Sequence, residues 1–217
     1  MVSRMEMMDE QTKEKVREIL STQLEGEVTL HVFTSKENCE YCEATKEIAS
    51  ELSDIDNRIV VKNYDLKEDR EVAEKMNIGM APAIVVQADG GSVRYFGIPS
   101  GYEFSSLLED ITDASSHKTK IPEEIAEKIR AINEPVHIKV FVTPTCPYCP
   151  RAVRTAHQFA MLNSKITADM IEAIEFPELS EKYSVMAVPR IVVNEKVTFE
   201  GAVPESEFAE HVLEAVH

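Results

Sequence analysis

The residues best suited to chemistry in this chain are its four cysteines, which form two C-x-x-C pairs. Cys39 and Cys42 lie in NCEYC, and Cys146 and Cys149 lie in TPTCPYC. A cysteine thiolate serves as a metal ligand or as the nucleophile of thiol–disulfide exchange. The spacing alone therefore leaves three interpretations: a zinc site, a structural disulfide, or a disulfide that opens and closes in a redox cycle. Structural disulfides usually close longer loops, where they restrict the unfolded chain more, so the short spacing disfavours that interpretation.

The sequence around the first pair recurs around the second. A shift of 107 positions superimposes the two pairs and also brings Pro82 of MAPAIVV onto Pro189 of AVPRIVV. Further along the shift is 104, which pairs Gly97 with Gly201, because QADGGSVRYFG is three residues longer than NEKVTFEG. The extra residues include a Gly-Gly and indicate a longer hairpin turn. Length differences that are confined to connections indicate a duplicated fold.

Each copy shows the same order of predicted elements around its cysteines. The first copy has helical patterns at about 9–24, 42–52 and 68–76, strand patterns at 28–33, 59–64, 83–86 and 92–96, and an amphipathic helix at its end. The second has helical patterns at about 122–132, 149–162 and 177–183, strand patterns at 136–142, 166–170, 190–193 and 196–199, and again a terminal helix. The segment ITADMIEAIEF, which contains the strand at 166–170, also fits a helix. The order predicts an α/β fold in each copy, a mixed central sheet flanked by helices.

The copies define two predicted domains, residues 1–117 and 118–217, with the boundary near the polar stretch TDASSHKTK from Thr112 to Lys120. The formal net charge of −16 disfavours nucleic acid as a partner, because phosphate binding needs clustered Lys and Arg side chains. No apolar run approaches the roughly 20 residues of a membrane span, and the N-terminal segment MVSRMEMMDEQ lacks the apolar core of a signal peptide. The expected location is the cytoplasm, without membrane association.

These motifs together resemble a known family. A strand, a C-x-x-C at the start of a helix and a proline 40 residues after the second cysteine resemble the thioredoxin fold, and TPTCPYC with AVPRIVV is similar to glutaredoxins. Two fused units, each with an intact C-x-x-C, resemble the protein disulfide oxidoreductases found mostly in thermophilic archaea and bacteria. The resemblance implies a tandem duplication of the thioredoxin fold and thiol–disulfide exchange on protein disulfides or dithiols. It also implies a thioredoxin-reductase-like flavoenzyme as electron donor and no cofactor, since the redox group is the cysteine pair.

The chemistry assigns a role to each cysteine. Free amide groups at a helix N-terminus lower the pKa of a nearby thiol, which favours the nucleophilic thiolate. Cys39 and Cys146 are therefore the predicted nucleophiles, and Cys42 and Cys149 the resolving cysteines. The family resemblance places a loop with a cis-proline beside the sulfur, where its backbone could pair with an extended substrate. The predicted substrate-binding residues are Ala81, Pro82, Val188, Pro189, Tyr41 and Tyr148.

Other interpretations of the cysteines remain. A single zinc site would have to join two pairs with 103 residues between Cys42 and Cys146, although each pair has its own strand, helix and proline. The six histidines form no metal-spaced cluster, so no metal site is predicted. A second function is that of an electron-relay module in a peroxide-reducing system, because the N-terminal domain of alkyl hydroperoxide reductase flavoproteins has a similar double-thioredoxin layout. A third is a chaperone-like binder or scaffold with inert pairs.

The two sites are predicted to be unequal. Glu37, Glu40 and Glu43 surround the first pair, whereas Arg151 and Arg154 follow the second. Because like charge disfavours a thiolate, the pKa of Cys39 should exceed that of Cys146. His31 occupies the strand region where thioredoxins keep a buried acid that assists proton transfer; packing is the commoner role of such a histidine.

Overall fold

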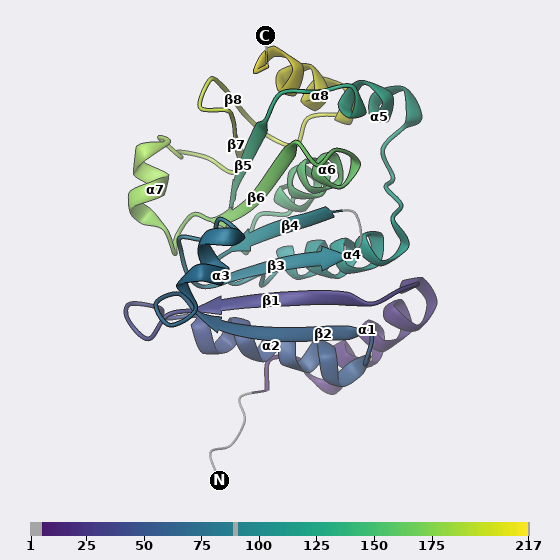
Figure 1. The fold of residues 1–217 in the computed structure, drawn as a ribbon, viewed down its shortest axis with the longest axis vertical. Helices are drawn as coiled ribbons and strands as arrows, with labels where there is room; N and C mark the ends of the chain where they lie inside the picture. Colours follow the sequence, from purple (N-terminus) through teal and green to yellow (C-terminus); the bar gives the residue numbers. More distant parts are fainter. Residues whose placement is uncertain (1–5, 89–90, 217) are drawn as a thin grey trace.

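The computed structural model describes residues 6–88 and 91–216, and in it the strands form one continuous mixed sheet (Figure 1). Its strand order is β2-β1-β3-β4-β6-β5-β7-β8. The strands are β1 (Val28–Thr34), β2 (Ile59–Asp65), β3 (Ala83–Ala88), β4 (Gly91–Phe96), β5 (Val136–Val142), β6 (Ile166–Glu172), β7 (Arg190–Val193) and β8 (Val197–Glu200). The helices are α1 (Glu10–Gln23), α2 (Cys42–Ile55), α3 (Arg70–Lys75), α4 (Glu103–Ser116), α5 (Glu123–Arg130), α6 (Cys149–Leu162), α7 (Pro177–Lys182) and α8 (Glu205–Glu214).

The sheet consists of two equivalent halves, which confirms the predicted duplication. In each half the first strand pairs in parallel with the second and antiparallel with the third, which pairs antiparallel with the fourth. The halves meet where β4 runs parallel to β6, with residues 94–96 opposite 169–171. The longer hairpin turn predicted in the first copy includes residues 89 and 90, which lie outside the described residues.

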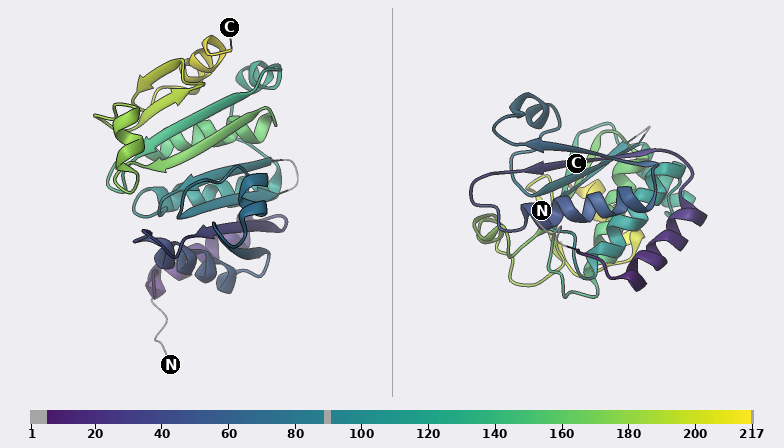
Figure 2. Two further views of the ribbon diagram at one scale, coloured as in Figure 1. Left: turned by 60° about the vertical axis from the view of Figure 1, so that its left-hand side comes forward. Right: turned by 90° about the horizontal axis from the view of Figure 1, so that it is seen from below.

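Helices cover both faces of this sheet. Figure 2 shows α3 on one side of the first half and α1 and α2 on the other. The larger apolar core lies under α1, α2, α4, α5, α6 and α8, and a smaller core that includes Phe33, Phe96 and Phe141 lies under α3 and α7. Because α2 and α6 pack against the strand that precedes each of them, they fix both C-x-x-C turns at the same edge of the sheet.

Two segments show where the sequence pattern was incomplete. The strand predicted at 166–170 is β6, and it is buried along almost its whole length because it lies in the middle of the sheet. This burial removes the alternation that marks an exposed strand. The predicted boundary stretch begins inside α4, since Thr112 to Ser116 are helical. Their polar side chains bind the rest of the protein: the Ser115 hydroxyl accepts a hydrogen bond from the Glu25 amide at 3.1 Å.

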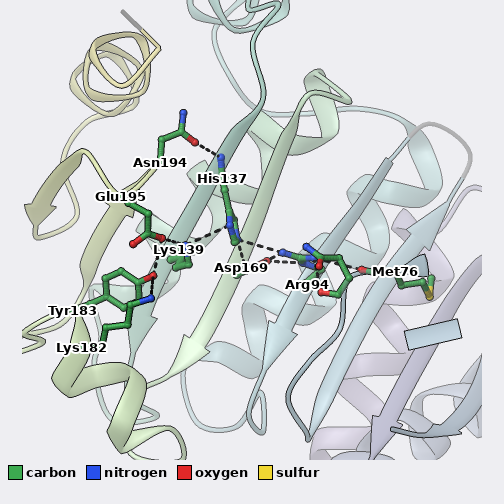
Figure 3. Close-up of polar contacts among 10 residues, drawn as sticks. Met76, Arg94, His137, Lys139, Asp169, Lys182, Tyr183, Asn194 and Glu195 are labelled. Atoms are coloured by element: carbon green, nitrogen blue, oxygen red, sulfur yellow. Dashed lines mark hydrogen bonds and ion pairs between the residues drawn. The ribbon is translucent and has the colours of Figure 1, made fainter. Parts of the chain in front are cut away.

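Buried charged side chains connect the two halves along the β4–β6 junction (Figure 3). The Arg94 guanidinium donates to both carboxylate oxygens of Asp169, at 2.6 and 3.0 Å, and also to the Asn77 carbonyl at 3.1 Å. His137 Nε2 lies 2.6 Å from Asp169 Oδ2. Burial raises the pKa of Asp169, but the His137 hydrogen bond and the Arg94 charge outweigh it and hold that pKa below its usual value.

A second polar cluster joins α4 to α6. The Asp110 carboxylate binds the Tyr95 hydroxyl, the Arg154 guanidinium and His157 Nδ1, the last at 2.6 Å. Arg154 also binds Asp113. Burial, followed by the charge of Arg154, lowers the pKa of His157 to about 3, so this histidine is neutral at ordinary pH.

Candidate active sites

The first site lies where β1 ends and α2 begins. Cys39 and Cys42 form a disulfide, with Cα atoms 5.4 Å apart, and Cys42 is the first residue of α2. Cys39 is partly exposed on the turn before the helix, whereas Cys42 is buried and its sulfur accepts a hydrogen bond from the Ser35 amide at 3.2 Å. The accessible sulfur is therefore the one that the sequence predicts to be the nucleophile.

The second site repeats the positions of the two cysteines at the start of α6, but here the first cysteine, Cys146, is also buried, with 8% of its surface exposed. Cys146 and Cys149 form a disulfide with Cα atoms 5.5 Å apart, and Cys149 is the first residue of the helix. The Cys149 amide, one of the free donors of the helix N-terminus, points at Cys146 Sγ at 3.1 Å. Pro150 occupies the first turn, where its missing N–H group removes no helical hydrogen bond. The amide contact is the geometry that stabilises a thiolate on Cys146 when the disulfide is reduced.

A loop with a cis-proline lies beside each site. The Ala81–Pro82 and Val188–Pro189 peptide bonds are both cis. The Pro82 carbonyl accepts a hydrogen bond from the Gly97 amide, and the Pro189 carbonyl one from the Gly201 amide, both at 2.9 Å. Both glycines have positive φ, +93° for Gly97 and +89° for Gly201. The two positions that the sequence repeat aligns thus have the same backbone conformation.

The predicted substrate-binding residues fall into two groups around the two disulfides. Ala81, Pro82 and Tyr41 line one pocket together with Cys39. At the other site the Val188 carbonyl lies 3.8 Å from Cys146 Sγ. Pro189 follows Val188 in that loop, and Tyr148 lies between the two cysteines with 70% of its surface exposed.

His31 does not take part in the arrangement around Cys39. It lies within β1 on the face that carries α3, stacked on Tyr64, and its Nε2 lies 2.8 Å from the Gln87 side-chain oxygen. It lines a pocket with Arg94 and Met76, separate from the pocket that contains Cys39. Burial lowers the pKa of His31. These contacts are those of a packed histidine.

The charges around the two sites differ from those that the sequence suggests. Arg154, counted there among the cations near Cys146, is bound by the carboxylates of Asp110 and Asp113 between α4 and α6. Arg151 lies 3.6 Å from Glu205. At the first site, in contrast, two additional carboxylates come from the other half of the molecule.

These carboxylates belong to Glu172 and Glu175, which sequence reasoning missed. Both line the pocket beside Cys39 although they lie more than 130 positions away in the chain. Glu172 is the last residue of β6 and Glu175 follows it, and only the pairing of β6 with β4 brings them to the first site. The sequence repeat does not reveal that pairing. The repeat defines the elements within each copy, whereas the β4–β6 pairing is a contact between the copies.

Metal-binding and membrane-spanning features are absent from the described part of the chain. No group of three or more His, Cys, Asp or Glu side chains in residues 6–88 and 91–216 is arranged to hold a metal ion. None of the helices in those ranges has the length and apolar content of a membrane span.

Comparisons with known proteins agree with this geometry. Residues 17–112 match the thioredoxin-like domain family and residues 136–214 the thioredoxin domain family. The fold and the two C-x-x-C disulfides thus define a protein of two thioredoxin-type units, each with one C-x-x-C pair. A solved protein disulfide oxidoreductase from Aeropyrum pernix k1 is 32% identical, with a TM-score of 0.88, and the match covers 96% of this chain and 93% of that one. The chain belongs to the protein disulfide oxidoreductase family.

Other relatives belong to alkyl hydroperoxide reductases. The AhpF protein of the alkyl hydroperoxide reductase of Staphylococcus aureus strain Mu50 is 28% identical over 190 residues, which are 87% of this chain and 34% of the relative. The chain thus spans about a third of the length of the curated relatives that it matches. The solved AhpF structure from Enterococcus faecalis has the same fold, with a TM-score of 0.87 at 23% identity, and the match covers 95% of this chain and all of that one.

Proposed function

We propose that the protein exchanges disulfides with protein substrates at both C-x-x-C pairs, with Cys39 and Cys146 as nucleophiles. The observation that carries this proposal is the repeated geometry. In each half, one cysteine lies on the turn before a helix, its partner is buried at the first position of that helix, and a cis-proline loop lies alongside. The two units are proposed to divide between residues 117 and 118.

The reaction proceeds in two exchanges. In the reductive direction the Cys146 thiolate attacks one sulfur of a substrate disulfide, which forms a mixed disulfide and releases the other substrate sulfur as a thiolate. The Cys149 thiolate then attacks Cys146, which releases the second substrate thiolate and leaves the protein as a disulfide. The substrate gains two electrons and the protein loses two. Substrate oxidation is the reverse sequence, and Cys39 and Cys42 act in the same way.

An extended polypeptide suits the surface at the second site. Val188 lies next to Cys146, so its backbone is available to pair with a substrate strand. Tyr148 and Met186 expose 70% and 90% of their surfaces on the two loops that carry the site. Large exposed apolar side chains are typical of surfaces that bind other proteins.

Turnover requires a partner that restores the cysteine pairs. In the reductive cycle a thioredoxin-reductase-like flavoenzyme supplies two electrons to each disulfide, and in the oxidative cycle an acceptor removes them. The proposed setting is the cytoplasm of a thermophile, because intracellular disulfides are common in hyperthermophiles and rare in mesophiles.

A second candidate is an electron relay that reduces the disulfide of a thiol peroxidase. The similarity over 87% of this chain to the AhpF protein of alkyl hydroperoxide reductase favours it. The chemistry at the cysteines is the same, and the two functions differ in the protein that accepts the electrons. If the protein reduces the disulfide of a thiol peroxidase much faster than those of insulin at equal substrate concentration, the relay function is favoured.

The test is reduction of insulin disulfides by dithiothreitol, followed by turbidity. We expect the parent to accelerate the reaction, Cys39→Ser and Cys146→Ser to lower the rate in part, and the double variant to show only the uncatalysed rate. Ser21→Ala serves as a control, because Ser21 lies at an exposed position of α1 outside both sites. A double variant as active as the parent would contradict the nucleophile assignment.

A further inference from the structure

A pocket of about 400 Å³ opens beside Cys39 and has walls from both halves of the protein. From the first half come the active-site turn, the cis-proline loop and the segment after β4; from the second come the turn before α6 and the β6–α7 connection. Its lining includes Cys39, Glu40, Glu172, Ile174, Glu175 and Pro177.

Two carboxylates, those of Glu172 and Glu175, belong to the second half's wall. Glu172 is 2% exposed; its Oε2 accepts a hydrogen bond from the Glu175 amide at 2.6 Å, whereas its Oε1 has no donor among the described residues. Glu175 Oε1 accepts a hydrogen bond from the Ile98 amide at 2.7 Å. A buried carboxylate oxygen without a donor is costly in free energy, so a donor that enters the pocket is favoured.

The charges around the pocket have one sign. Among the described lining residues there are three carboxylates, Glu40, Glu172 and Glu175, and no basic side chain. The lysines near this site are already paired, Lys36 with Glu68 and Lys67 with Glu37. Burial raises the pKa of Glu175 to about 7, and the neighbouring charges of Glu172 and Glu40 contribute; burial also raises the pKa of Glu172. Positive charge in the pocket would relieve this repulsion.

The second site has no equivalent wall among the described residues. A Cβ atom on Gly97 would lie 2.5 Å from Glu172 Cβ and 2.8 Å from Glu175 Oε1, so the absence of a side chain at this position lets both residues approach. Around Gly201, its counterpart in the repeat, no described atom lies within 4 Å of such a Cβ. The reason is topological: β6 flanks β4, whereas β8 ends the sheet.

We infer that this pocket binds a lysine or arginine side chain of a protein substrate, next to the substrate cysteine that Cys39 attacks. The inference rests on the proposed function and specifies the substrates of the first site. Ile174, 72% exposed at the rim, and Pro177 supply apolar surface for the methylene stem of such a side chain. The Glu172 and Glu175 carboxylates accept the hydrogen bonds of its charged end.

The experiment uses the full chain with Cys146→Ser and Cys149→Ser, so that only the first site reacts. Its substrates are three disulfide-linked fluorescent peptides that differ in one residue beside the cysteine: Lys, Gln or Glu. We expect kcat/KM for the Lys peptide to exceed that for the Gln peptide about tenfold, as one charge-assisted hydrogen bond would give, with the Glu peptide slowest. The complementary protein, with Cys39→Ser and Cys42→Ser, should show a Lys/Gln ratio near one.

Glu172→Gln and Glu175→Gln keep the shape of the wall and remove its charge, and each should lower the Lys/Gln ratio toward one. Glu43→Gln is the matched control, because Glu43 is exposed on α2 and is not among the lining residues. The ratio should also fall between pH 8 and pH 6, as Glu175 takes up a proton. A general effect of the negative charge near the site would act on all three peptides, and the Glu43→Gln control measures that effect.

Three outcomes would overturn the inference: a ratio near one in the parent, an equal slowing of all peptides by the Glu variants, or a loss of the ratio in Glu43→Gln. Equal slowing would mean that the carboxylates act on the cysteines and not on the substrate. If no peptide reacts at the first site, the proposed function of that site fails, and the inference fails with it. Reaction of all peptides without preference would leave the proposed function intact and refute only the inference.

Discussion

The first residue of α4, Glu103, provides a quantitative test of how this fold treats a buried carboxyl group. Glu103 is 1% exposed, and burial raises its pKa to about 7, with the neighbouring Ser106 hydroxyl opposing that rise in part. The ordinary value is 4.5. A difference of about 2.5 pKa units corresponds to about 3 kcal/mol of stability that depends on pH.

The sign follows from proton binding in the two states. Between pH 4.5 and about 7 the unfolded chain releases the Glu103 proton while the folded protein keeps it, so the folded state binds more protons. The free energy of unfolding therefore falls as pH rises through this window, and the loss is complete above about pH 7. Glu103→Gln removes the titrating group, and its stability should lack this component.

The assay is urea unfolding of the oxidised parent and of Glu103→Gln at several pH values from 4.5 to 8, with circular dichroism and fluorescence as independent probes. The stability of the parent relative to the variant should fall by about 3 kcal/mol across the range. His157 and Asp113, which also have shifted pKa values, contribute equally to both proteins and cancel in the difference. Glu210→Gln, at an exposed position of α8, should run parallel to the parent. A pH-independent difference between parent and Glu103→Gln would refute the reasoning.

Three other results should follow. Asp169→Asn leaves the buried Arg94 charge without its partner and should destabilise the protein by about 3–5 kcal/mol. The double variant Arg94→Met/Asp169→Leu should recover much of that loss, and urea unfolding measures the stability of both variants. Iodoacetamide alkylation against pH, on proteins that keep one pair each, should show Cys39 ionising at higher pH than Cys146, and the reverse order would invalidate the charge argument. Thiol counting should find no free thiol in denatured oxidised protein and four after reduction, while stoichiometric bound zinc would point to a metal site.

Features within one copy could be predicted from the sequence because each depends on local residues. The C-x-x-C pairs, the prolines at 82 and 189 and the repeat between them define the fold and locate both sites, and the ends of most helices and strands fall within a few residues of their predicted positions. The helix predicted to begin at about residue 122 starts at Glu123, with Pro122 as its N-cap.

Contacts between the copies could not be predicted in the same way. No local pattern shows that β4 pairs with β6, so the positions of Arg94 and Asp169 and of the Glu172 and Glu175 wall emerge only from the folded chain. One such contact, between Asp113 and Arg154, also explains part of the polar end of α4, whose side chains looked like those of a linker. The sequence could not show that the charge of Arg154 near Cys146 is neutralised, because its partners Asp110 and Asp113 come from the other half of the protein.

The central claim is that Cys39 and Cys146 attack substrate disulfides, and trapping of the mixed disulfide tests it most directly. Reduced protein with Cys42→Ser and Cys149→Ser cannot resolve the intermediate, so a disulfide-containing substrate should remain attached. Peptide mass spectrometry should locate the attachment at Cys39 and at Cys146, and the Cys39→Ser/Cys146→Ser protein should retain little substrate. Retention of substrate mainly through Cys42 and Cys149, or no retention in either protein, would contradict the account.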